Sequence, residues 1–246
     1  MPAAQVPWNF DYAPFQVLNP YLSESFLVTS FSTMPNQKKP LHIAVAGNIG
    51  AGKTTLTELL AKHYGWTPHF ENVDQNPYLT DFYEDMPRWA FNLQVYFLNS
   101  RLQKLHEIRS GKESIIQDRT IYEDTQIFAP NLYDMGLMSK RDFDNYTSLF
   151  ETSMKKMDAP DLLIYLKATI PKLVDQIQAR GREYEENIRL DYLKRLNKFY
   201  DSWIESYAAG PLLVVDVDKL DFANRDEDFA DIVRRIDAQL FGLFKV

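Results

Sequence analysis

The sequence of 246 residues contains no cysteine. Without a thiol the chain can form neither a disulfide framework nor a zinc–thiolate site, and it fits a cytoplasmic location. It also has no apolar run that approaches the roughly 20 residues of a membrane span. Its N-terminus lacks the basic segment and apolar core of a signal peptide. We therefore expect neither a membrane-embedded nor an exported protein.

Positive charge is scarce as well. Lys and Arg number 27 against 34 Asp and Glu, which gives a formal net charge of −7. Proteins that bind DNA or RNA are usually basic, so no nucleic acid polymer is expected as a partner. A small ligand held in a local basic pocket is still compatible with this balance. The hydrophobic share of 45% and the length predict one α/β domain with a full core.

The chain divides near residue 40. Residues 1–40 are rich in Pro and aromatic residues, show no helical or alternating period, and have no Lys or Arg before Lys38. We predict a disordered N-terminal extension here and a folded domain over residues 41–246. Met34 leaves open an alternative in which the protein begins at that residue.

From Leu41 onward, short apolar runs alternate with amphipathic segments. This alternation is typical of a parallel sheet covered by helices on both faces. The expected fold is a doubly wound α/β domain with a five-stranded parallel sheet in the order 2-3-1-4-5. The predicted strands are 41–46, 67–71, 114–117, 161–166 and 212–217, and the predicted long helices are 88–110 and 190–208.

The strongest motif follows the first predicted strand. The segment reads G-N-I-G-A-G-K-T-T and leads into a helical pattern, which is the strand–loop–helix setting of a P-loop. Glycines let the backbone turn its N–H groups toward phosphate oxygens, and the helix N-terminus adds a favourable dipole. Lys53 supplies a charge for the β- and γ-phosphates, and Thr54 an oxygen for Mg²⁺. The residues predicted to bind ATP are Gly47, Asn48, Ile49, Gly50, Ala51, Gly52, Lys53, Thr54 and Thr55.

A P-loop also occurs in nucleotide switches, so a non-catalytic GTP binder is one alternative. Such a protein would carry an Asn-Lys-x-Asp guanine reader and an Asp-x-x-Gly after a central strand. The segment Asn197-Lys198-Phe199-Tyr200 lacks the Asp, and Asp118-Arg119-Thr120-Ile121 lacks the Gly. Both motifs of a switch are therefore missing.

Two carboxylates follow predicted strands at the edge where ligands bind in open α/β sheets. Glu71 follows the second strand, where it can accept the proton of a hydroxyl that attacks the γ-phosphate; a surface acid in a turn is the alternative. Asp118 follows the third strand, where it can hold Mg²⁺ or its water shell; a helix cap is the alternative. Arg119 comes next and can act on the reacting phosphate or the base.

The predicted helix from residue 88 carries a polar stripe. Gln94 and Arg101 are seven residues apart, so they lie on one face, two turns from each other. Beside Trp89, Phe91 and Phe97, an amide and a guanidinium suit a planar polar ligand, although core packing of the aromatics is the alternative. Further on, Arg180 and Arg182 flank a glycine and precede several acids, which indicates either a mobile lid over a triphosphate or a solvated charge run.

These segments, in their order and spacing, resemble the deoxynucleoside kinase family, specifically its bacterial deoxyadenosine/deoxyguanosine kinases. The resemblance spans residues 41–231 and includes the P-loop, Tyr-x₅-Trp-x₄-Gln-x₆-Arg, Asp-Arg-Thr-x₃-Asp and the Arg-Gly-Arg segment. It implies transfer of a phosphoryl group from ATP to a deoxynucleoside, a nucleotide-salvage step, and a homodimer formed by packed helices. A nucleoside monophosphate kinase of the thymidylate kinase type is the enzymatic alternative; such an enzyme needs no base for a 5′-hydroxyl.

The resemblance also implies roles for individual residues. Glu71 is the general base, Tyr83 and Glu185 contact the sugar 3′-hydroxyl, and Arg119 lies close to base and phosphates. Arg180 and Arg182 are lid arginines. Further predicted contacts are Trp89, Gln94, Arg101 and Asp124 with the deoxynucleoside, of which the last three read the base edge, and Asp216, Val217 and Asp218 with the ATP adenine.

Overall fold

The computed structural model describes residues 39–71, 76–155, 157–182, 185 and 188–242. The predicted N-terminal extension and the alternative start at Met34 lie outside these residues, apart from Lys39 and Pro40. None of the described helices is long and apolar enough to cross a membrane.

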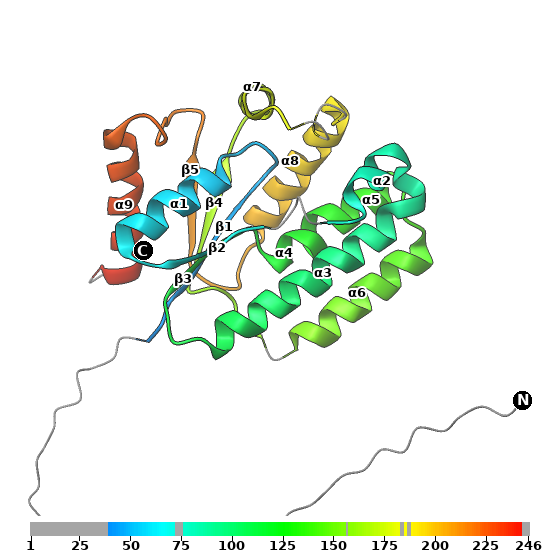
Figure 1. Ribbon diagram of the computed structural model, residues 1–246, viewed down its shortest axis with the longest axis horizontal. Helices are drawn as coiled ribbons and strands as arrows, with labels where there is room; N and C mark the ends of the chain where they lie inside the picture. The colour runs from blue at the N-terminus through cyan, green and yellow to red at the C-terminus, as the bar shows by residue number, and fades with distance from the viewer. Residues whose placement is uncertain (1–38, 72–75, 156, 183–184, 186–187, 243–246) are drawn as a thin grey trace, which may run out of the picture. The chain divides into compact units, whose positions relative to one another are not determined.

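A five-stranded sheet forms the centre of the domain (Figure 1). All neighbouring strands are parallel, and their order is β2-β3-β1-β4-β5, which confirms the predicted topology. Because the carboxyl ends of parallel strands meet at one edge, the segments that follow β1, β2 and β3 come together there. The strands are β1 (His42–Gly47), β2 (Thr67–His69), β3 (Ile115–Asp118), β4 (Leu162–Lys167) and β5 (Leu212–Asp216).

Helices cover both faces of this sheet, with α1 and α9 on one side and α3 and α8 on the other (Figure 1). The longest is α3, which begins where Pro87 predicts; the Asp85 side chain accepts a hydrogen bond from the Arg88 N–H at 3.2 Å. The helices are α1 (Lys53–Tyr64), α2 (Leu79–Glu84), α3 (Met86–Ser110), α4 (Ile121–Glu123), the π-helical turn η1 (Asp124–Phe128), α5 (Ala129–Asp134), α6 (Lys140–Met154), α7 (Ile170–Arg180), α8 (Leu190–Glu205) and α9 (Asp226–Phe241).

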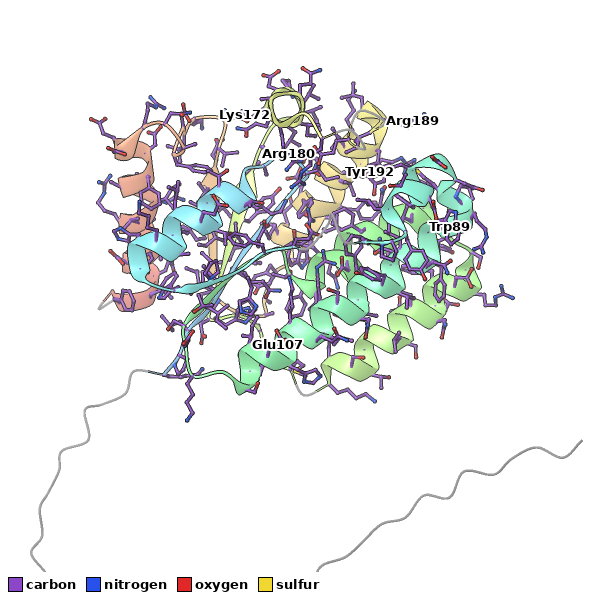
Figure 2. The ribbon with its side chains drawn as sticks, viewed as in Figure 1. Trp89, Glu107, Lys172, Arg180, Arg189 and Tyr192 are labelled. Atoms are coloured by element: carbon purple, nitrogen blue, oxygen red, sulfur yellow. The ribbon has the colours of Figure 1, made fainter. Side chains whose placement is uncertain are left out.

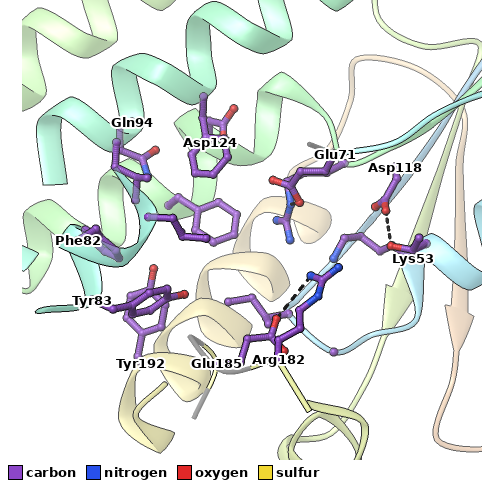
Figure 3. Close-up of a pocket in the computed structure, with 18 of the residues that line it drawn as sticks. Lys53, Glu71, Phe82, Tyr83, Gln94, Asp118, Asp124, Arg182, Glu185 and Tyr192 are labelled. Atoms are coloured by element: carbon purple, nitrogen blue, oxygen red, sulfur yellow. Dashed lines mark hydrogen bonds and ion pairs between the residues drawn. The ribbon is translucent and has the colours of Figure 1, made fainter. Parts of the chain in front are cut away.

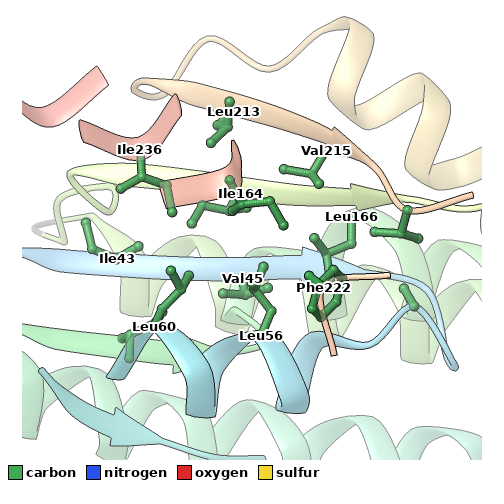
Figure 4. Close-up of a cluster of buried hydrophobic side chains, with 14 of the residues drawn as sticks. Ile43, Val45, Leu56, Leu60, Ile164, Leu166, Leu213, Val215, Phe222 and Ile236 are labelled. Carbon is green, nitrogen blue, oxygen red and sulfur yellow. The ribbon is translucent and has the colours of Figure 1, made fainter. Parts of the chain in front are cut away.

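Strand β1 separates the two main apolar clusters. Ile43 and Val45 pack toward α1 and α9, whereas Ala44 and Ala46 face α3 and α8. All four side chains are fully buried, as expected for a central parallel strand with both faces covered. Figure 4 shows the first cluster between the sheet and its helices. The P-loop therefore leaves the sheet from its central strand, which is buried on both faces.

His42, at the start of β1, is a buried histidine at the edge opposite the P-loop. Its Nε2 lies 2.9 Å from Gln117 Oε1. Burial lowers the pKa of His42 to about 4, although the bond to Gln117 opposes this shift. The folded pKa therefore lies below the unfolded value of 6.5, and the unfolded chain binds the proton more readily between these two values.

We expect this histidine to make the domain less stable in mild acid. The contribution of His42 to the free energy of unfolding is fully present above pH 6.5 and is lost as the pH falls toward 4. Between pH 7 and pH 5 the free energy of unfolding should fall by about 2 kcal/mol for this reason. In urea unfolding at both pH values, His42→Gln should remove this part of the pH dependence. His106→Gln, at an exposed position on α3, is the control and should keep it. An unchanged pH dependence in His42→Gln would contradict the assignment.

Candidate active site

The P-loop connects β1 to α1, as the motif predicts. Gly50 and Gly52 have φ of 83° and 88°, a region that side chains with a Cβ rarely adopt. A Cβ on Gly50 would also lie 2.7 Å from the carbonyl oxygen of Leu173. Lys53 Nζ donates to the carbonyls of Gly47 and Asn48 at 2.9 and 3.1 Å. Burial, assisted by nearby Arg119, lowers the pKa of Lys53 to about 8.

Thr54 and Asp118 lie side by side at the start of α1 and the end of β3. Thr54 Oγ1 donates to Asp118 Oδ2 at 2.5 Å, and among the described residues Asp118 Oδ1 has no hydrogen-bond partner although it is buried. Burial raises the pKa of Asp118, while Lys53 lowers it. A hydroxyl and a carboxylate oxygen fit Mg²⁺, which keeps waters and phosphate oxygens in its shell rather than requiring a full protein cage. Among His, Cys, Asp and Glu, no group of three or more that could hold a metal ion occurs in the described parts of the chain.

Glu71 lies just after β2 and is held by two arginines. Arg119 Nε donates to Glu71 Oε2 at 2.8 Å, and Arg101 Nη2 donates to Glu71 Oε1. Burial alone would raise the pKa of Glu71, but Arg119, Arg101 and Lys53 together lower it to about 2. Glu71 is therefore an ionised carboxylate at neutral pH, fixed between α3 and the end of β3.

The polar stripe of α3 faces the same region. Arg101 Nη1 donates to both carboxylate oxygens of Asp124, at 2.7 and 2.6 Å, and its guanidinium carbon lies 4.7 Å from the centre of the Phe97 ring. Gln94 is buried, and its Oε1 has no hydrogen-bond partner among the described residues. Burial raises the pKa of Asp124 to about 7, although Arg101 lowers it. An amide, a guanidinium and a carboxylate thus converge beside an aromatic ring, as a planar polar ligand requires.

Arg119 has a backbone that the sequence did not predict. Its φ is +66°, the left-handed region that non-glycine residues rarely adopt. Thr120, which follows it, caps α4: the Glu123 side chain accepts from the Thr120 N–H at 2.7 Å. The alternative that Asp118 caps this helix is therefore wrong, because the cap lies two residues later.

Glu123 and Tyr200 complete this part of the site, and sequence reasoning gave them no role. Glu123 is fully buried and lies 3.4 Å from Arg119 Nη1, and the Tyr200 hydroxyl lies 2.7 Å from the same carboxylate. The Thr-x-x-Glu spacing of a capping box could have indicated Glu123. Nothing in the sequence places Tyr200 of α8 next to the P-loop.

The predicted lid residues lie at the C-terminal end of α7. Gly181, with φ of 65°, ends the helix, and Arg180 Nε donates to Glu185 Oε2 at 3.0 Å. Arg182 Nη1 lies 3.8 Å from Glu185 Oε1. Residues 183–184 and 186–187 of the lid segment lie outside the described residues. Glu185 therefore holds both arginines toward the P-loop (Figure 3).

One cavity joins these groups (Figure 3). The P-loop and the lid arginines line one end, Gln94 and Asp124 the other, and Glu71 lies between them. Its lining comprises Ile49, Gly50, Lys53, Thr54, Glu71, Leu79, Phe82, Tyr83, Leu93, Gln94, Phe97, Arg101, Asp118, Arg119, Asp124, Phe128, Arg180, Arg182, Glu185 and Tyr192.

Trp89 does not line this cavity as the described residues form it. Its ring packs 5.7 Å from that of Tyr78, with the Arg88 guanidinium 4.4 Å from its centre, near the N-terminal end of α3 (Figure 2). The substrate contact assigned to Trp89 stays a prediction.

The segment after β5 also lies outside the cavity lining. Val217 is buried in the apolar cluster that contains residues of α1 and α9. The Asp218 carboxylate accepts a hydrogen bond from the Thr169 N–H at 3.0 Å. The adenine contact assigned to Asp216, Val217 and Asp218 stays a prediction.

The family model described as deoxynucleoside kinase matches residues 43–241. The chain belongs to the deoxynucleoside kinase family. It is thus a phosphotransferase that acts on a hydroxyl group of a deoxynucleoside, and neither the switch nor the monophosphate kinase alternative is favoured.

Individual relatives agree with the family assignment. The deoxyadenosine/deoxycytidine kinase of Bacillus subtilis is 41% identical over 196 residues, 79% of this chain and 90% of that protein. A deoxyguanosine kinase of Lactobacillus johnsonii is 38% identical over 207 residues, 80% of this chain and 92% of that protein. The structure of deoxyadenosine kinase from M. mycoides with bound dATP superposes with a TM-score of 0.72 at 30% identity, covering 80% of this chain and 99% of that one.

For this kinase we expect Lys53→Ala to abolish turnover while the protein stays folded, because the lysine of a P-loop is expected to contact phosphates and contributes little to the apolar core. Thermal unfolding and a phosphorylation assay on the same sample would measure both. Near-normal turnover in a well-folded variant would exclude the phosphate role of Lys53.

Proposed function

We propose that this kinase transfers the γ-phosphoryl group of ATP to the 5′-hydroxyl of a purine deoxynucleoside, with deoxycytidine as a weaker substrate. The observation that carries the proposal is the position of Glu71, between the P-loop end and the Gln94–Asp124 end of one cavity. A deoxynucleoside whose base lies beside Gln94 would present its 5′-hydroxyl to Glu71 and to a phosphate on Lys53. Among the relatives, proteins named for deoxyadenosine, deoxyguanosine and deoxycytidine all occur.

The low pKa of Glu71 defines what this carboxylate can do. With a pKa of about 2 it is a weak base toward a free alcohol. In a loose transition state the bond to the leaving group is largely broken before the attacking hydroxyl loses its proton. We infer that Glu71 first orients the 5′-hydroxyl through a hydrogen bond and takes its proton late, once the oxygen has begun to bond to phosphorus.

The other polar groups of the cavity are proposed to bind the phosphates and the sugar. Lys53, Arg119 and the lid arginines Arg180 and Arg182 neutralise charge on the transferring phosphoryl group. Mg²⁺, held through Thr54 and Asp118, would supply charge neutralisation on the phosphate oxygens when bound. Tyr83 and Glu185 are proposed to contact the sugar 3′-hydroxyl. The homodimer and the cytoplasmic location stay predictions of the sequence.

We expect Glu71→Gln to lower kcat by about 10² to 10⁴, the usual range for the loss of a general base, with a smaller effect on deoxynucleoside binding. Glu107→Gln, an exposed carboxylate of α3, is the control and should leave kcat unchanged. Steady-state kinetics and calorimetry separate the two effects. If binding fell as strongly as turnover, Glu71 would be a binding residue only.

The hydrogen-bond donors and acceptors of Gln94, Arg101 and Asp124 predict which base the site selects. The ion pair with Arg101 favours the ionised form of Asp124, which accepts only. Arg101 donates only, and Gln94 offers one donor group and one acceptor group. Adenine, guanine and cytosine carry an exocyclic amine for the carboxylate, whereas thymine carries none and adds a methyl group. Thymidine should therefore leave Asp124 short of a donor and meet Arg101 sterically, a penalty of about 1–3 kcal/mol.

We expect the double replacement Arg101→Met with Asp124→Ala to raise thymidine turnover relative to deoxyadenosine. Both changes are needed, because Arg101→Met alone would leave Asp124 buried without its partner, and Asp124→Ala alone would leave Arg101 in the pocket, still paired with Glu71. A panel of the four deoxynucleosides with ATP, run on the wild type and the double variant, measures the ranking. Equal use of thymidine and deoxyadenosine by the wild type, or an unchanged ranking in the variant, would show that this pair does not read the base.

A further inference from the structure

The hydroxyl of Tyr200 lies among three polar groups of the site. Tyr200, on α8, is fully buried, and its Oη lies 2.9 Å from the carbonyl oxygen of Gly47, the last residue of β1 and the first of the P-loop. The same oxygen lies 2.7 Å from Glu123 Oε1 and 3.1 Å from Arg119 Nη1. Helix α8 thus reaches the P-loop, Glu123 and Arg119 through one atom.

A phenol has a single hydrogen, so Tyr200 can donate to only one of its two acceptors at a time. Its third neighbour, Arg119 Nη1, donates to it. A carboxylate is the stronger acceptor, and the Gly47 carbonyl already receives Lys53 Nζ at 2.9 Å. In the arrangement described, the Tyr200 hydrogen therefore belongs on Glu123.

Nucleotide binding changes this balance. When Lys53 turns to a phosphate oxygen it leaves the Gly47 carbonyl, and a buried acceptor that loses its donor weakens binding. Glu123 keeps other donors when it loses the hydrogen bond from Tyr200. Its Oε1 also accepts from the Gly47 N–H at 3.3 Å, and its Oε2 accepts from the Thr120 N–H at 2.7 Å.

We propose that Tyr200 is a positioning residue whose hydroxyl hydrogen turns from Glu123 to the Gly47 carbonyl as Lys53 turns to the nucleotide phosphate. No covalent bond changes; one hydrogen bond replaces another. The inference rests on the proposed binding of ATP phosphates by Lys53 and adds a residue of α8 to that step. It makes nucleotide affinity, and not deoxynucleoside affinity, depend on the hydroxyl.

The test compares Tyr200→Phe with the wild type by calorimetry, using ADP with Mg²⁺ and, separately, deoxyadenosine. The phenylalanine ring can still stack on Tyr165, whose ring centre lies 5.7 Å from that of Tyr200, so we expect the variant to fold. We expect the Kd for ADP to weaken about 10-fold, as for one buried acceptor without a donor, and the Kd for deoxyadenosine to stay unchanged. Tyr64→Phe removes a hydroxyl bonded to Asp237 at 2.9 Å on the α1–α9 side and should change neither.

A second background separates this role from a structural one. In Lys53→Ala the Gly47 carbonyl has lost the lysine both with and without nucleotide, so adding Tyr200→Phe should cause no further loss of ADP affinity. An equal loss in both backgrounds, or an equal loss for deoxyadenosine, would overturn the proposal. A wild type that binds no ADP would instead contradict the proposed function.

Should Tyr200→Phe fail to fold, Glu123→Gln carries the test. The neutral amide competes less for the hydroxyl hydrogen, which then stays on Gly47, so the ratio of the Kd for ADP to the Kd for deoxyadenosine should stay near the wild-type ratio. A 10-fold or greater rise of this ratio in a folded Glu123→Gln protein would overturn the proposal.

Discussion

The ion pairs of Glu71 with Arg101 and Arg119 are the contacts on which the rest of the site depends. They tie together the segments after β2 and β3 and the middle of α3. Each side chain is largely removed from water, so loss of one partner would leave buried charges with less compensation. The same pairs make Glu71 acidic enough to remain ionised wherever the protein is folded at neutral pH. The ion pairs with Arg101 and Arg119 therefore set both the position of the Glu71 carboxylate and its ionised state.

The fold explains why such charges can be gathered in an acidic protein. The net charge is −7, yet Lys53, Arg101 and Arg119 are buried at one edge of the sheet. Arg101 and Arg119 are paired with carboxylates, whereas Lys53 Nζ donates to the carbonyls of Gly47 and Asn48. A phosphorylated ligand at the P-loop would therefore meet the positive charge of Lys53 although the protein as a whole is anionic. The lid arginines Arg180 and Arg182, both paired with Glu185, add positive charge to the same cavity.

Strain is concentrated beside these charges. Arg119 adopts a left-handed backbone conformation, and its guanidinium contacts Glu71, Glu123 and Tyr200. A rare conformation persists only where its surroundings over-determine it. Here the capping box of α4 fixes the residue that follows, and α8 supplies the tyrosine. Several elements thus hold Arg119 at once.

The sequence alone determined the layers of the fold and the P-loop, because these follow from local periodicity and from a motif whose backbone conformation requires glycine at fixed positions. The strand order was predicted for the fold as a whole, since local periodicity does not encode which strands are neighbours. It also determined which carboxylates end strands, and hence that Glu71 and Asp118 share an edge. Tertiary structure decided the rest. Trp89 packs on Tyr78 although its spacing suits a substrate stripe, since spacing along a helix gives the face and not the neighbour. Tyr200 reaches Gly47 across 153 positions of sequence, a contact that no local pattern encodes and that only the packing of α8 against the sheet creates.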